Sequence, residues 1–149
     1  MNGEEITINN TVDALNNHIG FLPEDRKNQA LVLDLTVREN ITLACLKALS
    51  KYNFLDKKRE KALSEEYIER MRIRTPSMEQ KIKNLSGGNQ QKVAISKWLA
   101  TNSQVLILDE PTRGIDVGSK KEIHTLMSDL AKQGVAIIMI SSELPEILG

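Results

Sequence analysis

The sequence predicts an α/β fold with a parallel sheet and a largely helical middle segment, and three observations support this prediction. Two uninterrupted aliphatic runs, at 105–108 and 135–140, are typical of strands in a parallel sheet that is covered on both faces. The residues between these runs have the apolar spacing of a helix, and a strand–helix–strand order implies a right-handed crossover. Residues 28–84 change to helical patterns, which separates them from the segments on either side.

The composition is that of one globular domain. The 149 residues suffice for a single core, and 20 Lys and Arg balance 20 Asp and Glu. This neutrality and the aromatic content of 3% give no indication of a nucleic-acid or acidic-lipid partner. The longest apolar run, 135–140, is far shorter than the roughly 20 residues of a membrane span. The acidic start does not resemble a signal peptide, and the single Cys45 fits a reducing cytoplasm.

The first 84 residues predict short strands followed by helices. Strands are expected at 6–8 and 19–22, and Pro23 should end the second. Thr36 and Glu39 have the spacing of a capping box at the start of a helix. The apolar face of that helix is expected to comprise Val37, Ile41, Ala44, Cys45 and Ala48. A second helix near 59–73, whose charged start at 57–61 should be solvated, has an inner stripe of Leu63, Tyr67 and Met71.

The C-terminal part predicts alternating helices and strands. A helix is expected from Lys92 to Ala100, followed by the strand at 105–108. Asp116 can cap the next helix, and Gly134 is well placed to end it before the buried strand at 135–140. The apolar stripe of this helix comprises Ile123, Leu126, Met127 and Leu130.

The heptad Leu85-Ser86-Gly87-Gly88-Asn89-Gln90-Gln91 is the strongest chemical signal. Two glycines allow the backbone to approach a ligand, and Ser86 offers a cap and a hydroxyl group. The helix that follows presents its positive dipole end, so the segment predicts an anion site. A simple helix cap after a flexible turn is the alternative interpretation.

The segment 105–111 delivers two carboxylates to the C-terminal end of a strand, where ligands bind in open α/β sheets. In nucleotide hydrolases such an aspartate, here Asp109, holds magnesium through water, and the adjacent glutamate, here Glu110, orients or deprotonates the attacking water. Asp109 as a simple turn former is the alternative. The segment 114–120 only superficially resembles a phosphate-binding loop, and no Gly-x4-Gly-Lys-Ser/Thr occurs in the 149 residues. His18 and His124 have no partner at catalytic or metal spacing, so surface or helix-face roles are expected.

These motifs resemble those of ABC ATPases. Leu85 to Gln91 looks like the ABC signature motif, 105–110 like the Walker B strand with its catalytic glutamate, and Gly114 to Asp116 like the D-loop. Further segments resemble the C-terminal half of tandem ATPase subunits that power monosaccharide import, the ribose type especially. These segments are 23–27, 37–40, 75–77, 90–91 and 141–143.

The resemblance implies a partial P-loop NTPase core, with residues 1–27 as core strands and Q-loop region, and 28–84 as a helical subdomain touching a permease. Residues 85–149 would carry the signature, Walker B, D-loop and switch regions. The nucleotide-contacting residues would be Leu85, Ser86, Gly87, Gly88 and Gln90. The Walker A loop is expected to precede residue 1, so the chain alone should be inactive. Glu24 stands at the Q-loop position and Ser142 at the switch position, where most ABC domains have glutamine and histidine.

The implied function is ATP-driven sugar import with Mg²⁺, performed peripherally on the cytoplasmic face of the membrane. The implied partners are a second nucleotide-binding half, a permease and, indirectly, a sugar-binding protein, but no nucleic acid. Two alternatives remain: a half that only completes its partner's ATP site, and an ABC ATPase outside transport. Residues 28–84 contain no sustained heptads, which argues against the long coiled coils of the second alternative.

Overall fold

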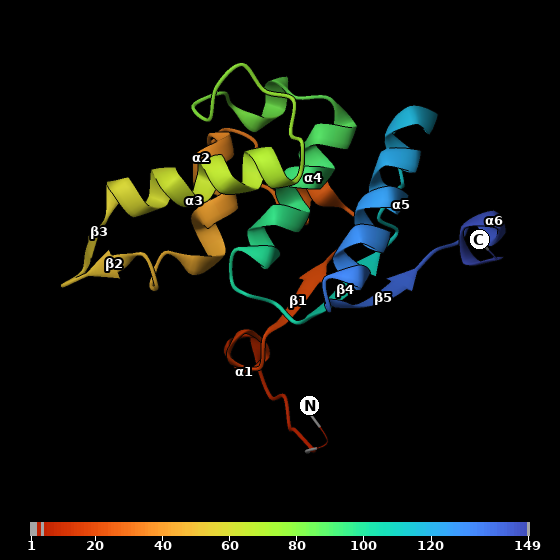
Figure 1. Cartoon of the computed structure of the whole chain (residues 1–149), viewed down its shortest axis with the longest axis horizontal. Helices are drawn as coiled ribbons and strands as arrows, with labels where there is room; N and C mark the ends of the chain where they lie inside the picture. The colour runs from red at the N-terminus through yellow and green to blue at the C-terminus, as the bar shows by residue number, and fades with distance from the viewer. Residues whose placement is uncertain (1–2, 4, 149) are drawn as a thin grey trace.

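The computed structural model describes residues 3 and 5–148, and a three-stranded parallel sheet lies at its centre (Figure 1). The strands β1 (Ile19–Leu22), β4 (Val105–Asp109) and β5 (Ala136–Ile140) are arranged in the order β1-β4-β5. Phe21 pairs with Ile107, and Ile107 with Ile138, which sets the register across the sheet. The predicted α/β class with a parallel sheet is confirmed.

The strand expected at 6–8 is wrong. Residues 5–9 have no regular structure, and Ile8 is exposed. The helix α1 (Thr11–Asn16) follows instead, capped by Asn10, whose side-chain oxygen accepts the amide of Asp13 at 2.9 Å. In the described part of the chain β1 pairs with β4 alone, so residues 6–8 have no strand to extend.

One face of the sheet is covered by α4 (Gly87–Leu99) and α5 (Val117–Lys132), which lie on the same side of it in Figure 1. Leu22, Leu106 and Leu108 point to this side and are fully buried. A Cβ atom on Gly20 would lie only 2.8 Å from Cβ of Trp98, so the close helix–sheet approach requires glycine there. α5 begins after Asp116 and ends before Gly134, as the sequence predicts.

The opposite face of the sheet is apolar but uncovered within the described residues. Ile138 and Ile140 of β5 are 53% and 49% exposed, and Phe21 of β1 is 45% exposed. The expectation that 135–140 is a fully buried strand is therefore wrong for one face. A continuous aliphatic run predicts a strand whose sheet is covered on both faces. Within the described residues, however, helices cover only one face of this sheet.

The helical part, residues 26–84, contains α2 (Val37–Thr42) and α3 (Lys57–Arg70) together with three short helical turns. The turn η1 (Arg26–Ala30) precedes α2, η2 (Leu43–Cys45) follows it directly, and η3 (Ile82–Asn84) comes after α3. A hairpin of β2 (Ser50–Lys51) and β3 (Phe54–Leu55) precedes α3. The capping box is confirmed: Thr36 Oγ1 accepts the Glu39 amide at 3.1 Å, and Glu39 Oε2 accepts the Thr36 amide at 2.8 Å. The first predicted helix is shorter than expected, because it passes into a 3-10 turn at Leu43.

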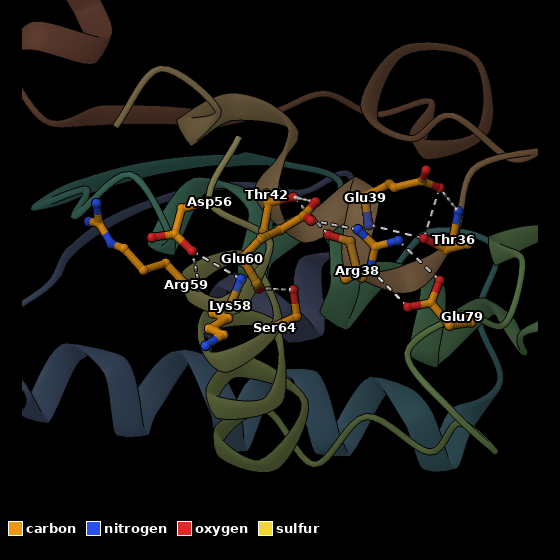
Figure 2. Close-up of polar contacts among 10 residues, drawn as sticks. All are labelled: Thr36, Arg38, Glu39, Thr42, Asp56, Lys58, Arg59, Glu60, Ser64 and Glu79. Atoms are coloured by element: carbon orange, nitrogen blue, oxygen red, sulfur yellow. Dashed lines mark hydrogen bonds and ion pairs between the residues drawn. The ribbon is translucent and has the colours of Figure 1, made fainter. Parts of the chain in front are cut away.

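A buried polar network joins α2 to α3 (Figure 2). Arg38 Nη1 donates to Glu60 Oε2 at 2.6 Å, and its Nε donates to Glu79 Oε1 at 2.8 Å. The Glu60 side chain is only 2% exposed, and Thr42 Oγ1 also donates to it at 3.2 Å. The hydrogen bond to Glu79 contributes most to raising the pKa of Arg38. The arginine thus remains charged between a buried and an exposed carboxylate.

Candidate functional site

The heptad at 85–91 comprises the N-cap and the first turn of α4. The helix begins at Gly87 rather than at Lys92, because Ser86 acts as its N-cap and its hydroxyl oxygen accepts the Asn89 backbone amide at 3.5 Å. The Asn89 side-chain amide donates to the same oxygen at 3.0 Å. Ser86 itself is exposed. The helix therefore aims its positive dipole end and an exposed hydroxyl in the same direction, which suits an anion.

Both heptad glycines are also required by packing within the chain. A Cβ atom on Gly87 would lie 2.9 Å from Arg26 Nη2 and 3.2 Å from Ile115 Cγ2. A Cβ atom on Gly88 would lie 2.4 Å from Ser119 Oγ and 2.6 Å from Ser119 Cβ. The start of α4 therefore packs closely against residues 114–119. The heptad at 85–91 and the segment 114–119 together form one surface.

Gln90 points inward and supports the preceding turn. Its side chain is buried, and Nε2 donates to the carbonyl oxygens of Ile82 at 3.1 Å and Leu85 at 3.2 Å. Any effect of Gln90 on a nucleotide would therefore be exerted through the position of Leu85 and Ser86.

Arg26 is a site residue to which the sequence reasoning gave no role. Its guanidinium donates to the carbonyl oxygens of Arg113 at 2.8 Å and Gly114 at 3.0 Å, and the residue is 9% exposed. Burial lowers the pKa of Arg26 despite the attraction of Asp25. Gly114 has a φ of 68°, which places its carbonyl group within reach of the guanidinium. Because the segment 23–27 is mostly polar, nothing in its pattern distinguishes this buried arginine from its exposed neighbours.

Glu110 and Ser142, expected at the catalytic and switch positions, lie together at the carboxyl ends of β4 and β5. The Ser142 amide donates to Glu110 Oε1 at 2.7 Å, and the Glu110 amide donates to the Ile140 carbonyl at 2.9 Å. Glu110 has a φ of 47°, uncommon for a residue other than glycine. The backbone beyond β5 therefore fixes the direction of the Glu110 carboxylate.

Glu146, in α6 (Leu144–Leu148), forms a second polar cluster behind this edge. Its carboxylate accepts hydrogen bonds from Ser141 Oγ at 2.7 Å and from Thr112 Oγ1, and it lies 3.3 Å from His124 Nε2. Burial favours the neutral form, but these bonds outweigh it, so the pKa of Glu146 is lowered. His124 thus has a partner, contrary to the sequence expectation, because α6 brings Glu146 back to α5.

The segment 114–120 is not a phosphate-binding loop, as the sequence reasoning concluded. Lys120 lies within α5, where its amino group pairs with Glu143 and lies 3.9 Å from Glu146. Asp116 caps the helix by accepting the Ser119 amide at 2.9 Å and the Ser119 hydroxyl at 2.7 Å. The hydroxyl bond is the largest of the contacts that lower the pKa of Asp116. The capping interpretation of Asp116 therefore describes its contacts in this chain.

Two carboxylates of the site suit a hard divalent cation. Asp109 ends β4 and Glu110 follows it, while the described residues contain no group of three or more ligands that could hold a metal alone. Mg²⁺ in nucleotide sites is held by one or two carboxylates together with phosphates and water, so Asp109 fits this role, and Glu110 beside it is available to an attacking water. Glu24 lies apart, paired with Arg113, beside an open cleft of about 360 Å³.

Residues 1–113 match the family model described as "ABC transporter". The chain belongs to the ABC transporter family. The ribose import ATP-binding protein of Shouchella clausii is 56% identical over 93% of the chain and 28% of that protein. The xylose import ATP-binding protein of Moorella thermoacetica is 55% identical over 100% of the chain and 29% of that protein. This ABC transporter chain thus spans less than a third of the length of these curated relatives.

The fold of this ABC transporter chain is that of an ATP-binding cassette. A dimeric cassette bound to ADP and phosphate aligns with a TM-score of 0.71 at 21% identity, over 93% of the chain and 59% of that structure. An ABC transporter cassette in its ADP conformation aligns with a TM-score of 0.73 at 24% identity, over 95% of the chain and 57% of that structure. Among residues 3 and 5–148, no helix combines the length and hydropathy needed to cross a bilayer.

Proposed function

We propose that this chain is part of the ATP-binding subunit of a monosaccharide importer. The observation that carries the proposal is the identity of 50% over the entire chain with the ribose import ATP-binding protein of Bacillus cereus, and of 56% over 93% of it with that of Shouchella clausii. The partners would be a membrane permease, a sugar-binding protein that acts through it, and a second nucleotide-binding half. The subunit would work peripherally on the inner face of the cell membrane.

In this proposal the chain contributes residues to two ATP sites. Ser86, Gly87 and Gly88 would contact the terminal phosphates of a nucleotide held by the other half, since α4 presents its N-terminus beside an exposed hydroxyl. Asp109 would hold Mg²⁺ through water, and Glu110 would orient or deprotonate the attacking water at the chain's own site. The Mg²⁺ ion would neutralise charge on the phosphates.

A second candidate is a half that completes its partner's site without hydrolysing ATP at its own. Ser142 favours this candidate, because the resemblance assigns it to the switch position, where a histidine would contact the γ-phosphate in most ABC domains. Its backbone amide donates to Glu110. Because the 149 residues contain no Gly-x4-Gly-Lys-Ser/Thr segment, we expect the chain alone to show no micromolar MgATP binding by calorimetry.

ATP turnover by the full-length subunit, with variants in this chain, tests the proposal. Gly87→Asp should reduce turnover by about a hundredfold or more, since it places a carboxylate where phosphate must approach. Gly87→Ala adds a Cβ atom at the same position without charge, so it measures the part of the loss that comes from the contacts with Arg26 and Ile115 alone. Glu110→Gln should cost much less if the competent site belongs to the partner half.

Equal losses for Gly87→Asp and Glu110→Gln would mean that the chain's own site is catalytic, and would exclude the non-hydrolysing candidate. Full activity of Gly87→Asp would contradict the role of the heptad in nucleotide binding.

A further inference from the structure

The hairpin before α3 carries two aromatic side chains that the fold does not use. Tyr52 is 86% exposed and Phe54 is 81% exposed, although aromatic residues make up only 3% of the chain. The hairpin protrudes at the end of the helical part that is remote from the sheet (Figure 1). Its inner face is formed by the Ser50–Leu55 pair, so the Lys51–Phe54 pair faces outward.

Tyr52 occupies a backbone position that normally selects against a large side chain. Tyr52 and Asn53 have φ angles of 52° and 65°, the left-handed pair required by a two-residue type I′ hairpin turn. Asparagine or glycine suits both positions, whereas a tyrosine is strained there. An exposed, strained aromatic residue therefore indicates a role outside folding.

Five exposed cations lie within five residues of Tyr52 or Phe54 along the chain, and local preferences disfavour three of these cations. Lys57, Lys58 and Arg59 lie in the first turn of α3, where the helix dipole favours anions. The full set of exposed cations is Lys47, Lys51, Lys57, Lys58 and Arg59. The only acid among residues 43–59 is Asp56, whose carboxylate accepts the amides of Lys58 and Arg59 at 3.0 and 3.1 Å.

These cations lack neutralising partners. Within residues 3 and 5–148, none of the five lies within 4.0 Å of a carboxylate. Lys51 Nζ instead lies 5.6 Å from the centre of the Tyr52 ring. The balanced charge of the whole chain thus conceals a local excess of positive charge around two exposed rings. We call Tyr52, Phe54 and the five cations the aromatic–basic tip.

We propose that the aromatic–basic tip docks on the anionic surface of a lipid bilayer. Tyrosine and phenylalanine rings suit the headgroup region, and lysine and arginine are attracted to anionic lipid phosphates. Because the hairpin protrudes from the helical part, its exposed rings and unpaired cations can reach a broad planar surface (Figure 1). Docking of the tip on lipid does not depend on ATP binding. It can therefore be tested independently of the proposed import function.

Flotation of the 149-residue chain with lipid vesicles tests the proposal. Binding is expected to vesicles of equal phosphatidylglycerol and phosphatidylcholine, and not to vesicles of phosphatidylcholine alone. Binding should weaken from low salt to 0.5 M salt, because salt screens exposed charges. Tyr52→Asn with Phe54→Ser should reduce partitioning roughly tenfold without unfolding, since asparagine suits the turn. Each of Lys57→Gln and Lys58→Gln should reduce it roughly fivefold.

Phe21→Ser is the matched control, because Phe21 is an exposed aromatic residue on the uncovered sheet face. It should leave vesicle binding unchanged. Equal binding to neutral vesicles, undiminished binding of the tip variants, or a loss confined to Phe21→Ser would each overturn the proposal. So would tip variants that impair a reconstituted importer but retain vesicle binding, since the tip would then contact protein.

Discussion

Arg38 forms one buried and one exposed ion pair, so the contributions of the two pairs to the free energy of unfolding can be compared at one side chain. Its contact with Glu60 is 2.6 Å long and buried, with Glu60 only 2% exposed. Its contact with Glu79 is 2.8 Å long, but Glu79 is 58% exposed. We expect Arg38→Met to lower the free energy of unfolding by about 3 to 5 kcal/mol, because it leaves the Glu60 charge buried with a single hydroxyl partner. Glu79→Ala should cost about 1 kcal/mol or less.

Urea denaturation followed by far-UV circular dichroism measures both effects. The variant Arg38→Met with Glu60→Gln removes the unpaired charge and keeps an acceptor for Thr42. Relative to Arg38→Met alone, this double variant should recover about 2 kcal/mol, within the range of coupling between contacting residues.

The reasoning would be refuted if Arg38→Met and Glu79→Ala had equal effects. It would also be refuted if the double variant were less stable than Arg38→Met, because the buried charge would then not be the source of the loss.

Three further predictions concern packing, pH and association. Gly88→Ala should cost about 1 to 3 kcal/mol in unfolding experiments, since its Cβ would lie 2.4 Å from Ser119 Oγ, and Ser119→Gly should restore part of the loss. Because the pKa of Glu146 is lowered from its ordinary 4.5, its stabilisation should be present above about pH 4.5 and be lost as pH falls through the lower folded pKa. Acid titration should therefore be flatter for Glu146→Gln, and an unchanged slope would contradict this assignment. The chain should self-associate in light scattering, and Ile138→Asn should reduce this, whereas a monomeric wild-type chain at high concentration would contradict the prediction.

The elements that the sequence predicted well depend on neighbouring residues along the chain. The Asp116 cap and Gly134 end define α5, and the capping box at Thr36 begins α2. These signals are short-range hydrogen bonds and φ preferences, so they are visible in the sequence. The heptad at 85–91 and the carboxylates at 109–110 were also recognisable as candidate site residues. Each is a short run of consecutive residues, so it can be read directly from the sequence.

Contacts between distant segments were decided by the tertiary structure alone. Arg26 is buried because carbonyl groups 87 and 88 residues away accept its hydrogen bonds, and polar sequence around it gives no sign of this. Ser142 reaches Glu110 only because β5 lies beside β4.

The strands also show where periodicity fails as a guide. An aliphatic run such as 135–140 specifies a strand that can be buried on both faces, but coverage of a face depends on other elements. In the described chain, helices cover one face and leave Ile138 and Ile140 exposed. The sequence by itself determined the strands β1, β4 and β5 and the capped ends of α2 and α5, since those depend on local backbone preferences. Burial and partner choice were decided only by the tertiary structure, because they depend on which distant segments meet.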